Sequence, residues 1–108
     1  MKVCDIAEKL SLKPLSLADS SREVTGAYIG DLLSWVMGRA ESGDAWITIM
    51  SNVNIIAVAS LSDVSCIILS ENVEIDDETA KIALQKQINI LKTSLTTYEA
   101  SVFLSKVI

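Results

Sequence analysis

The stretch that decides the fold is residues 46–69, which read WITIMSNVNIIAVASLSDVSCIIL. Trp46 to Met50 and Cys66 to Leu69 are short runs of bulky and β-branched residues, which favour strands. Between them, the polar pair Ser51-Asn52 can cap a helix, and the apolar segment from Val53 to Leu61 can form one. A strand, a helix and a strand with short links predict two parallel strands joined by a crossover helix.

The same alternation continues downstream of this unit. The acidic group Asp76-Asp77-Glu78 suits a helix N-terminus, and we expect that helix to run to about Gln85. Ile88 to Leu91 is a third apolar strand. Thr96 and Glu99 fit a capping box for a last helix. Three strand–helix units in succession predict a mostly parallel sheet.

Upstream, the pattern is less regular. Val3 to Leu10 has helical spacing of its apolar residues, and Leu12 to Leu17 contains the only proline, which favours an edge strand. We expect Val24 to Gly30 to be a structured loop. A helix opens at Asp31 and ends before Gly43, whose expected conformation is left-handed. The fold class predicted is α/β, with helices on both faces of a mostly parallel sheet in a single domain over residues 1–108.

One predicted helix lacks the polar face that an outer helix of a monomer should carry. Around Val53 to Leu61 the apolar residues point every way, with Ile55 and Val58 across from Val53 and Ile56. Trp35 likewise projects away from the apolar stripe of its own helix. Other parts of the same chain can cover these side chains. The interpretation that we favour is a subunit interface formed by Trp35, Ile55 and Val58, most simply in a twofold homodimer.

Composition excludes several function classes. Nine Lys and Arg residues stand against fourteen Asp and Glu, which gives a net charge of −5 and argues against nucleic-acid binding. The chain has no histidine, the commonest general base and metal ligand. It has no P-loop motif, and its two cysteines, Cys4 and Cys66, lie far apart. We therefore expect a cytoplasmic protein with no membrane span, no metal, no cofactor and no enzymatic activity.

One segment favours anion binding. Thr25 and Gly26 begin a stretch with two glycines ahead of a helix, and Arg22 lies just upstream. Backbone amides at such a loop can hold a small anion or a nucleotide, and an arginine can pair with it. Ligands of parallel sheets favour the carboxyl ends of the strands, where Asn52 is expected. The predicted ligand-binding residues are therefore Arg22, Thr25, Gly26 and Asn52, although the glycines can also serve a tight turn alone.

The stretch from Arg22 to Leu33, REVTGAYIGDLL, resembles the signature of the DRTGG domain. Ser21 and Ala27 stand where that signature has Asp and a second Gly, which puts a family ligand site in doubt. Further segments agree in order and extend the resemblance over essentially the whole chain. These segments are Lys2 to Leu10, Gly43 to Ile49 and Asn54 to Leu61.

The resemblance implies a fold similar to the N-terminal domain of bacterial HPr kinase/phosphorylases. It also implies a regulatory or dimer-forming role, as in the DRTGG domains that accompany CBS domains in regulated pyrophosphatases. The leading hypothesis is a non-catalytic regulatory module that homodimerises and senses a small anionic ligand. The alternative is a protein-interaction accessory factor for a redox enzyme of the hydrogenase type in an anaerobic bacterium.

Overall fold

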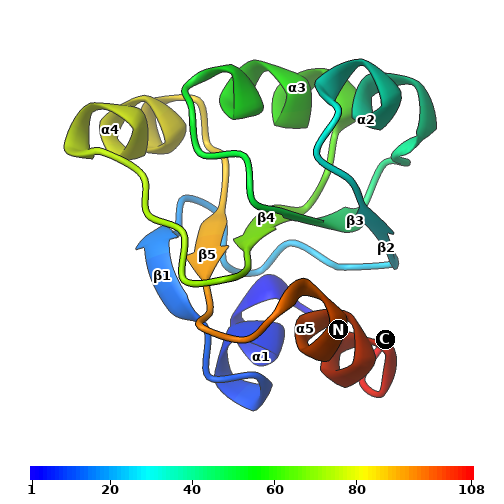
Figure 1. Cartoon of the computed structure of the whole chain (residues 1–108). Helices are drawn as coiled ribbons and strands as arrows, with labels where there is room; N and C mark the ends of the chain where they lie inside the picture. The colour runs from blue at the N-terminus through cyan, green and yellow to red at the C-terminus, as the bar shows by residue number, and fades with distance from the viewer.

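The computed structural model describes all 108 residues. Five strands form one sheet in the order β1-β5-β4-β3-β2 (Figure 1). β2 to β5 run parallel, and β1 pairs antiparallel with β5 at one edge. The elements, in chain order, are α1 Val3–Lys9, β1 Lys13–Ser16, β2 Gly26–Ile29, α2 Leu33–Arg39, β3 Asp44–Thr48, α3 Asn54–Ser62, β4 Cys66–Leu69, α4 Asp77–Gln85, β5 Ile90–Lys92 and α5 Thr97–Ser105.

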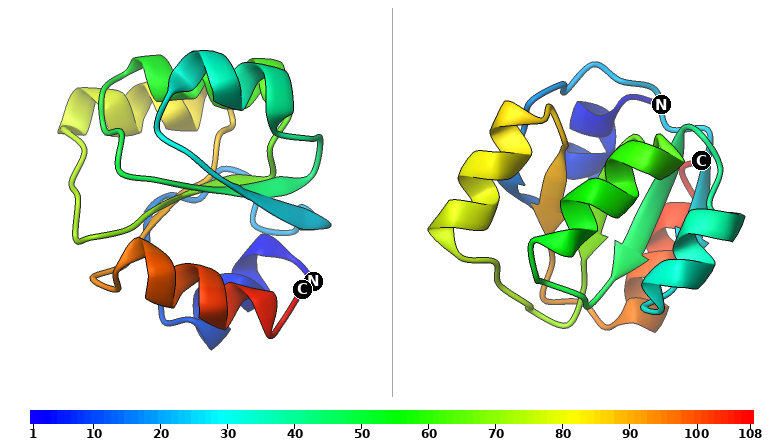
Figure 2. Two further views of the ribbon diagram at one scale, coloured as in Figure 1. Left: turned by 45° about the vertical axis from the view of Figure 1, so that its right-hand side comes forward. Right: turned by 90° about the horizontal axis from the view of Figure 1, so that it is seen from above.

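The helices cover both faces of the sheet. α2, α3 and α4 lie side by side on one face, and α1 and α5 lie on the other (Figures 1 and 2). Every residue of β3 and β4 is buried, because these central strands are covered above and below. The predicted fold class, a mostly parallel α/β domain with helices on both faces, is confirmed.

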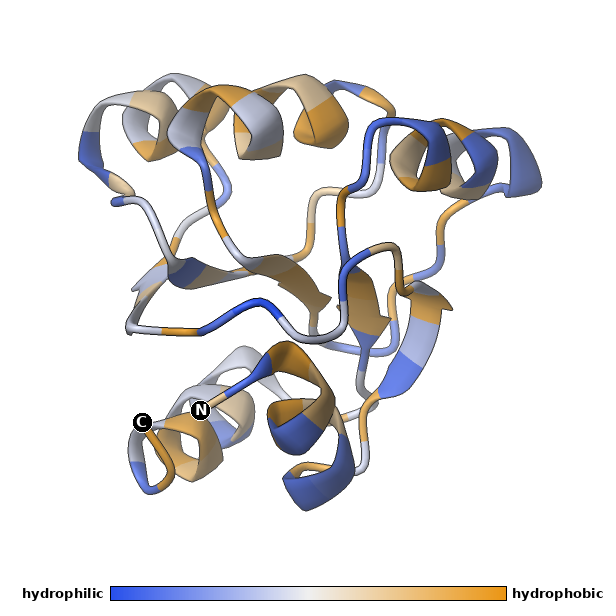
Figure 3. Cartoon of the chain, turned by 180° about the vertical axis from the view of Figure 1, so that it is seen from behind, coloured by the Kyte–Doolittle hydropathy of each residue, from blue (hydrophilic) through white to orange (hydrophobic).

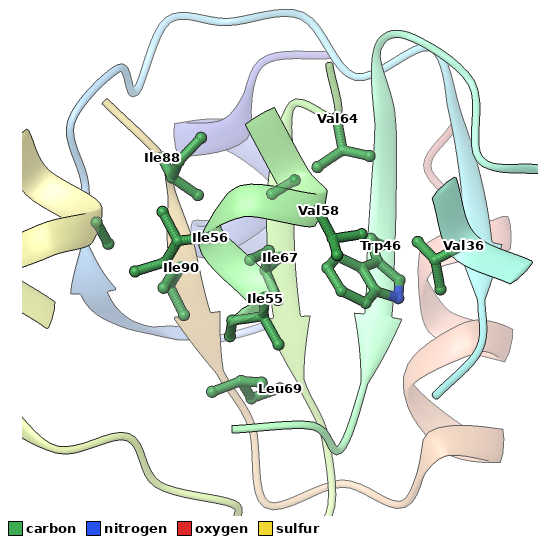
Figure 4. Close-up of a cluster of buried hydrophobic side chains, with 12 residues drawn as sticks. Val36, Trp46, Ile55, Ile56, Val58, Val64, Ile67, Leu69, Ile88 and Ile90 are labelled. Atoms are coloured by element: carbon green, nitrogen blue, oxygen red, sulfur yellow. The ribbon is translucent and has the colours of Figure 1, made fainter. Parts of the chain in front are cut away.

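Alternate residues of the central strands fill two separate cores. Trp46 and Ile67 are register partners that point toward the layer of α2 to α4, where Ile55 packs with them (Figure 4). Ile47 and Ile68 point to the other face, toward α1 and α5. The hydrophobic residues accordingly gather on the strands and on the sheet-facing sides of the helices (Figure 3). No helix has both the length and the apolar character needed to cross a membrane.

Local signals at the helix ends are largely confirmed. Asp76 caps α4 by accepting a hydrogen bond from the Thr79 amide at 2.7 Å. Thr96 and Glu99 form the expected capping box of α5. Gly43 has the expected positive φ of 88°, but it lies in the turn that leads into β3, because α2 already ends at Arg39.

The prediction of a loop over Val24 to Gly30 is wrong. Gly26–Ile29 forms strand β2, which pairs in parallel with Asp44–Ile47 of β3. Gly26 suits this strand because a Cβ there would lie 2.7 Å from a carboxylate oxygen of Asp44. Gly26 thus leaves room for the Asp44 side chain within a sheet, a requirement that the local sequence alone does not distinguish from a turn.

Ile55 and Val58, which were expected at a subunit interface, are covered by the chain itself. Ile55 is fully buried and Val58 is 5 % exposed within the single chain. α3 is the middle helix of its layer, so the sheet covers it below while α2 and α4 flank it (Figure 1). A helix in that position needs little polar surface. Trp35, in contrast, is 53 % exposed on α2.

Candidate functional site

The four residues predicted to bind a ligand lie at two opposite ends of the sheet. Arg22, Thr25 and Gly26 lie at the amino ends of β2 and β3. Asn52 follows the carboxyl end of β3, where its side-chain oxygen accepts a hydrogen bond from the Asn54 amide at 2.9 Å. Asn52 thus helps to begin α3, and the structure does not bring it together with the other three residues.

Arg22 is engaged by an internal carboxylate. One of its terminal nitrogens (Nη2) donates to the Asp63 side chain at 2.8 Å and to the Asp63 carbonyl oxygen at 2.6 Å. Asp63 ends α3 in the left-handed conformation, with φ of 56°. The hydroxyl of Ser42 donates to the second carboxylate oxygen. We call this set Arg22, Ser42 and Asp63 the amino-edge clasp.

The amino-edge clasp shifts the ionisation of Asp63. The hydrogen bond from Ser42, followed by the hydrogen bond and the positive charge of Arg22, holds the pKa of Asp63 below its ordinary value. Asp63 therefore stays ionised and neutralises Arg22. The clasp ties Arg22 to the end of α3. An external anion would have to compete with the Asp63 carboxylate for Arg22.

Thr25 and Gly26 have structural roles at the same end of the sheet. The Thr25 amide donates to the Gly43 carbonyl at 3.0 Å, and the Thr25 hydroxyl occupies the space that a Cβ on Gly43 would need. Both residues also border an open groove of about 460 Å³ between β2 and α5. No charged side chain lines this groove, whose walls are Thr25, Gly26, Ala27, Ile29, Ile47, Ser101, Leu104, Ser105 and Ile108.

The two edges of the sheet differ in how they are protected. β1 carries Lys13 and Pro14 and has an irregular register with β5, all of which hinder pairing with another strand. β2 reads Gly-Ala-Tyr-Ile and has no charge, no proline and no bulge. Its outer side has no partner strand. β2 is therefore an open edge with free backbone hydrogen-bonding groups.

Apolar side chains accompany this open edge. Ile29 at the end of β2 is 49 % exposed, and Leu32 just before α2 is 59 % exposed. Trp35 follows one turn later, with the Arg39 guanidinium 3.8 Å from the ring centroid. β2 and α2 lie on the same side of the molecule (Figures 1 and 2). We call β2 with Leu32 and Trp35 the β2-edge surface. Of these residues only Trp35 was expected from the sequence to lie at an interface, and the strand itself was not predicted.

The polar side chains at the carboxyl ends of the strands bond mainly to one another. Asp31 accepts hydrogen bonds from the Thr48 hydroxyl at 2.8 Å and from the Ile49 amide at 3.0 Å. The hydroxyls of Ser70 and Thr97 lie 2.7 Å apart. No group of three Cys, Asp or Glu side chains is arranged to hold a metal ion. These hydrogen bonds hold the loops at the carboxyl ends of the strands in place.

Comparison with known proteins identifies relatives of the whole chain. A family model described as the DRTGG domain matches residues 5–107. No curated protein matches the sequence significantly. Among solved structures, the fold is similar to the CBS and DRTGG domains of the regulatory region of Clostridium perfringens pyrophosphatase, complexed with the activator diadenosine tetraphosphate. The TM-score is 0.75 at 16 % identity, over 93 % of this chain and 44 % of that one, so the chain spans less than half of that structure.

Proposed function

The chain belongs to the DRTGG domain family, and from that premise we propose that it is a non-catalytic regulatory module that works as a homodimer and senses a small anionic ligand. The matching pyrophosphatase region is regulatory and was solved with a nucleotide activator. This similarity supports a role in sensing. In that protein, the matched DRTGG domain is part of the regulatory region of a pyrophosphatase.

The side chains of this chain support the absence of catalysis. There is no histidine to act as a general base. Burial raises the pKa of the Cys66 thiol to about 12, so that thiol is no nucleophile at neutral pH. The only buried cation, Lys92, pairs with Glu74. None of these groups forms a nucleophile–base pair.

The observation that carries the homodimer is the open β2 edge. Two copies related by a twofold axis would place their β2 strands antiparallel, and the backbone groups that each leaves free would pair with the other. The two sheets would then join into one continuous sheet. Leu32 and Trp35 of each copy would lie beside the new strand pair and lose contact with water.

The occupant of this edge is a second copy of the chain because the edge is self-complementary. It carries no charge that would repel its own copy, although the chain has a net charge of −5. The opposite edge, β1, is blocked by Lys13 and Pro14, so the association closes at two copies and does not continue into a fibre.

The mass of the protein in solution, measured by sedimentation velocity at micromolar to millimolar concentrations, tests this proposal. We expect twice 11.7 kDa for the wild type. Ile29→Lys places a charge on the open edge and should give the 11.7 kDa species. Leu84→Lys is the matched control, because Leu84 is 57 % exposed on α4, away from β2, and it should remain dimeric.

Two outcomes would contradict the proposal. A wild-type protein of 11.7 kDa at every concentration would exclude the homodimer and would leave the β2 edge to a different protein. A dimer that survives Ile29→Lys, with circular dichroism unchanged, would show that the copies meet elsewhere. Amide hydrogen exchange gives a direct second readout, because pairing should protect the 26–29 backbone in the wild type only.

A further inference from the structure

A second pocket opens at the carboxyl end of β5, on the face of the sheet that α1 and α5 cover. It has a volume of about 470 Å³, which falls within the range of small-molecule sites. Its walls come from three separated parts of the chain: the end of α1, the loop after β5, and α5 with its last turn. The lining residues are Lys9, Leu10, Ser11, Thr93, Ser94, Leu95, Phe103, Lys106 and Val107.

The topology of the sheet changes at this point. The links that leave β2, β3 and β4 all lead to helices on one face, whereas the link that leaves β5 leads to α5 on the other face (Figure 1). In open α/β sheets, ligands bind at the carboxyl ends of strands where neighbouring connections diverge to opposite faces. β4 and β5 are the neighbouring strands whose connections diverge here.

Hydrogen bonds close the gap between the loop that follows β4 and the loop that follows β5. The Asn72 amide donates to the Thr93 carbonyl at 3.0 Å, and the Glu71 amide donates to the Leu95 carbonyl at 2.8 Å. A ligand therefore has no room between the loops. The open space lies beside them, under β5 and between α1 and α5, which is where this pocket is found.

The charge of the pocket is opposite to that of the chain. Lys9 and Lys106 contribute two ammonium groups, and no Asp or Glu is among the lining residues. Neither lysine forms an ion pair within the chain; the three ion pairs present involve other cations. In a chain with a net charge of −5, two unpaired lysines at one pocket make a local site for an anion.

The pocket also has an aromatic wall and hydroxyl groups. Phe103 is 45 % exposed, and the Lys106 ammonium lies 5.5 Å from its ring centroid. Ser11, Thr93 and Ser94 add hydroxyl-bearing side chains to the lining. An exposed aromatic ring can stack on a base, while ammonium and hydroxyl groups bind phosphate oxygens.

We propose that this pocket binds a nucleotide, with its base against Phe103 and its phosphates between Lys9 and Lys106. The proposal rests on the proposed function and gives the sensing module its site. The proposed site lies at the carboxyl end of β5, whereas the sequence had suggested a ligand near Arg22. Arg22 is already paired with Asp63, but Lys9 and Lys106 form no ion pair.

Calorimetric titration of the full chain with ADP, adenosine and inorganic pyrophosphate tests this site. We expect ADP to bind more tightly than either fragment, and to bind more weakly as salt is raised. The double variant Lys9→Gln with Lys106→Gln should lose about a hundredfold in ADP affinity, which corresponds to about tenfold for the charge-assisted hydrogen bond of each lysine. The matched control is Lys81→Gln with Lys86→Gln, at α4 across the sheet, which also removes two positive charges and should bind ADP normally.

Three results would overturn the nucleotide site. These are no ADP binding at millimolar concentration, equal ADP affinity in the wild type and the double lysine variant, and pyrophosphate binding as tightly as ADP. The last would leave Phe103 without a role, and Phe103→Leu should then have no effect. The molecular mass of the same samples separates the two proposals, because a dimer that binds no ADP would contradict this site and not the homodimer.

Discussion

Replacement of Asn89 by Ala should lower the stability of the fold by about 3 kcal/mol. Asn89 is 2 % exposed and makes three hydrogen bonds. Its amide nitrogen donates to the carbonyls of Asp19 at 2.7 Å and Ser65 at 2.9 Å. Its oxygen accepts from the Asp19 amide at 2.8 Å. The side chain thus joins Asp19, at the start of the 19–24 segment, to Ser65, the residue before β4.

The magnitude follows from these three bonds. Each contributes a net stabilisation of about 1 kcal/mol, and Asn89→Ala removes all three at once. The entropy of unfolding is about 2.1 cal/mol/K per residue, or about 0.23 kcal/mol/K for 108 residues. A loss of 3 kcal/mol therefore lowers Tm by about 13 °C.

Urea and thermal unfolding, followed by circular dichroism at one fixed protein concentration, measure this loss. Fixing the concentration matters because a dimer makes Tm concentration-dependent. Asn54→Ala is the control, since Asn54 is exposed and its side chain makes no hydrogen bond; it should unfold close to the wild type. A decrease in Tm below about 4 °C for Asn89→Ala would refute the reasoning, because it would mean that water replaces the lost amide at little cost.

Two further predictions concern ionisable groups. The folded-state pKa of Asp63 is lowered, so the stability that it contributes is present above its ordinary pKa of 3.8 and is lost as pH falls below that value. Asp63→Asn should therefore be less stable than the wild type at neutral pH and should lose less stability between pH 7 and pH 3 in urea titrations; parallel losses would contradict the clasp. Cys4 is exposed while the Cys66 thiol is buried with a pKa of about 12, so a thiol reagent at pH 8 should label one cysteine quickly. Cys4→Ser should then abolish the fast labelling of the native protein, and fast labelling of this variant would mean that β4 opens readily.

Local chemistry made much of the fold predictable from the sequence. The capping box at Thr96 is complete within four residues, so no distant contact is needed to begin α5. Pro14 marked an edge strand because it cannot donate to a sheet ladder. The strand expected at Trp46 to Met50 begins two residues earlier, at Asp44, since pairing with β2 extends it.

What remained hidden depends on partners far along the chain. β2 becomes a strand only because β3, about 18 residues later, pairs with it. The ion pair of Arg22 with Asp63 spans 41 residues, and no local motif indicates it. The apolar pattern around Ile55 correctly showed that this helix would be covered on several sides. It could not show that α2 and α4 of the same chain provide the cover.

The proposed dimer edge and the proposed nucleotide pocket share one element, α5. Ser101, Leu104 and Ser105 border the groove beside β2, while Phe103 and Lys106 line the pocket. A ligand held by Phe103 and Lys106 therefore acts on the helix that also packs beside the dimer edge. Thermodynamic linkage makes any coupling between ADP binding and dimerisation reciprocal. If dimerisation changes the affinity for ADP by some factor, ADP must change the dimer dissociation constant by the same factor. If ADP binds the monomeric Ile29→Lys variant as tightly as the wild-type dimer, the two sites are uncoupled, and α5 transmits nothing between them.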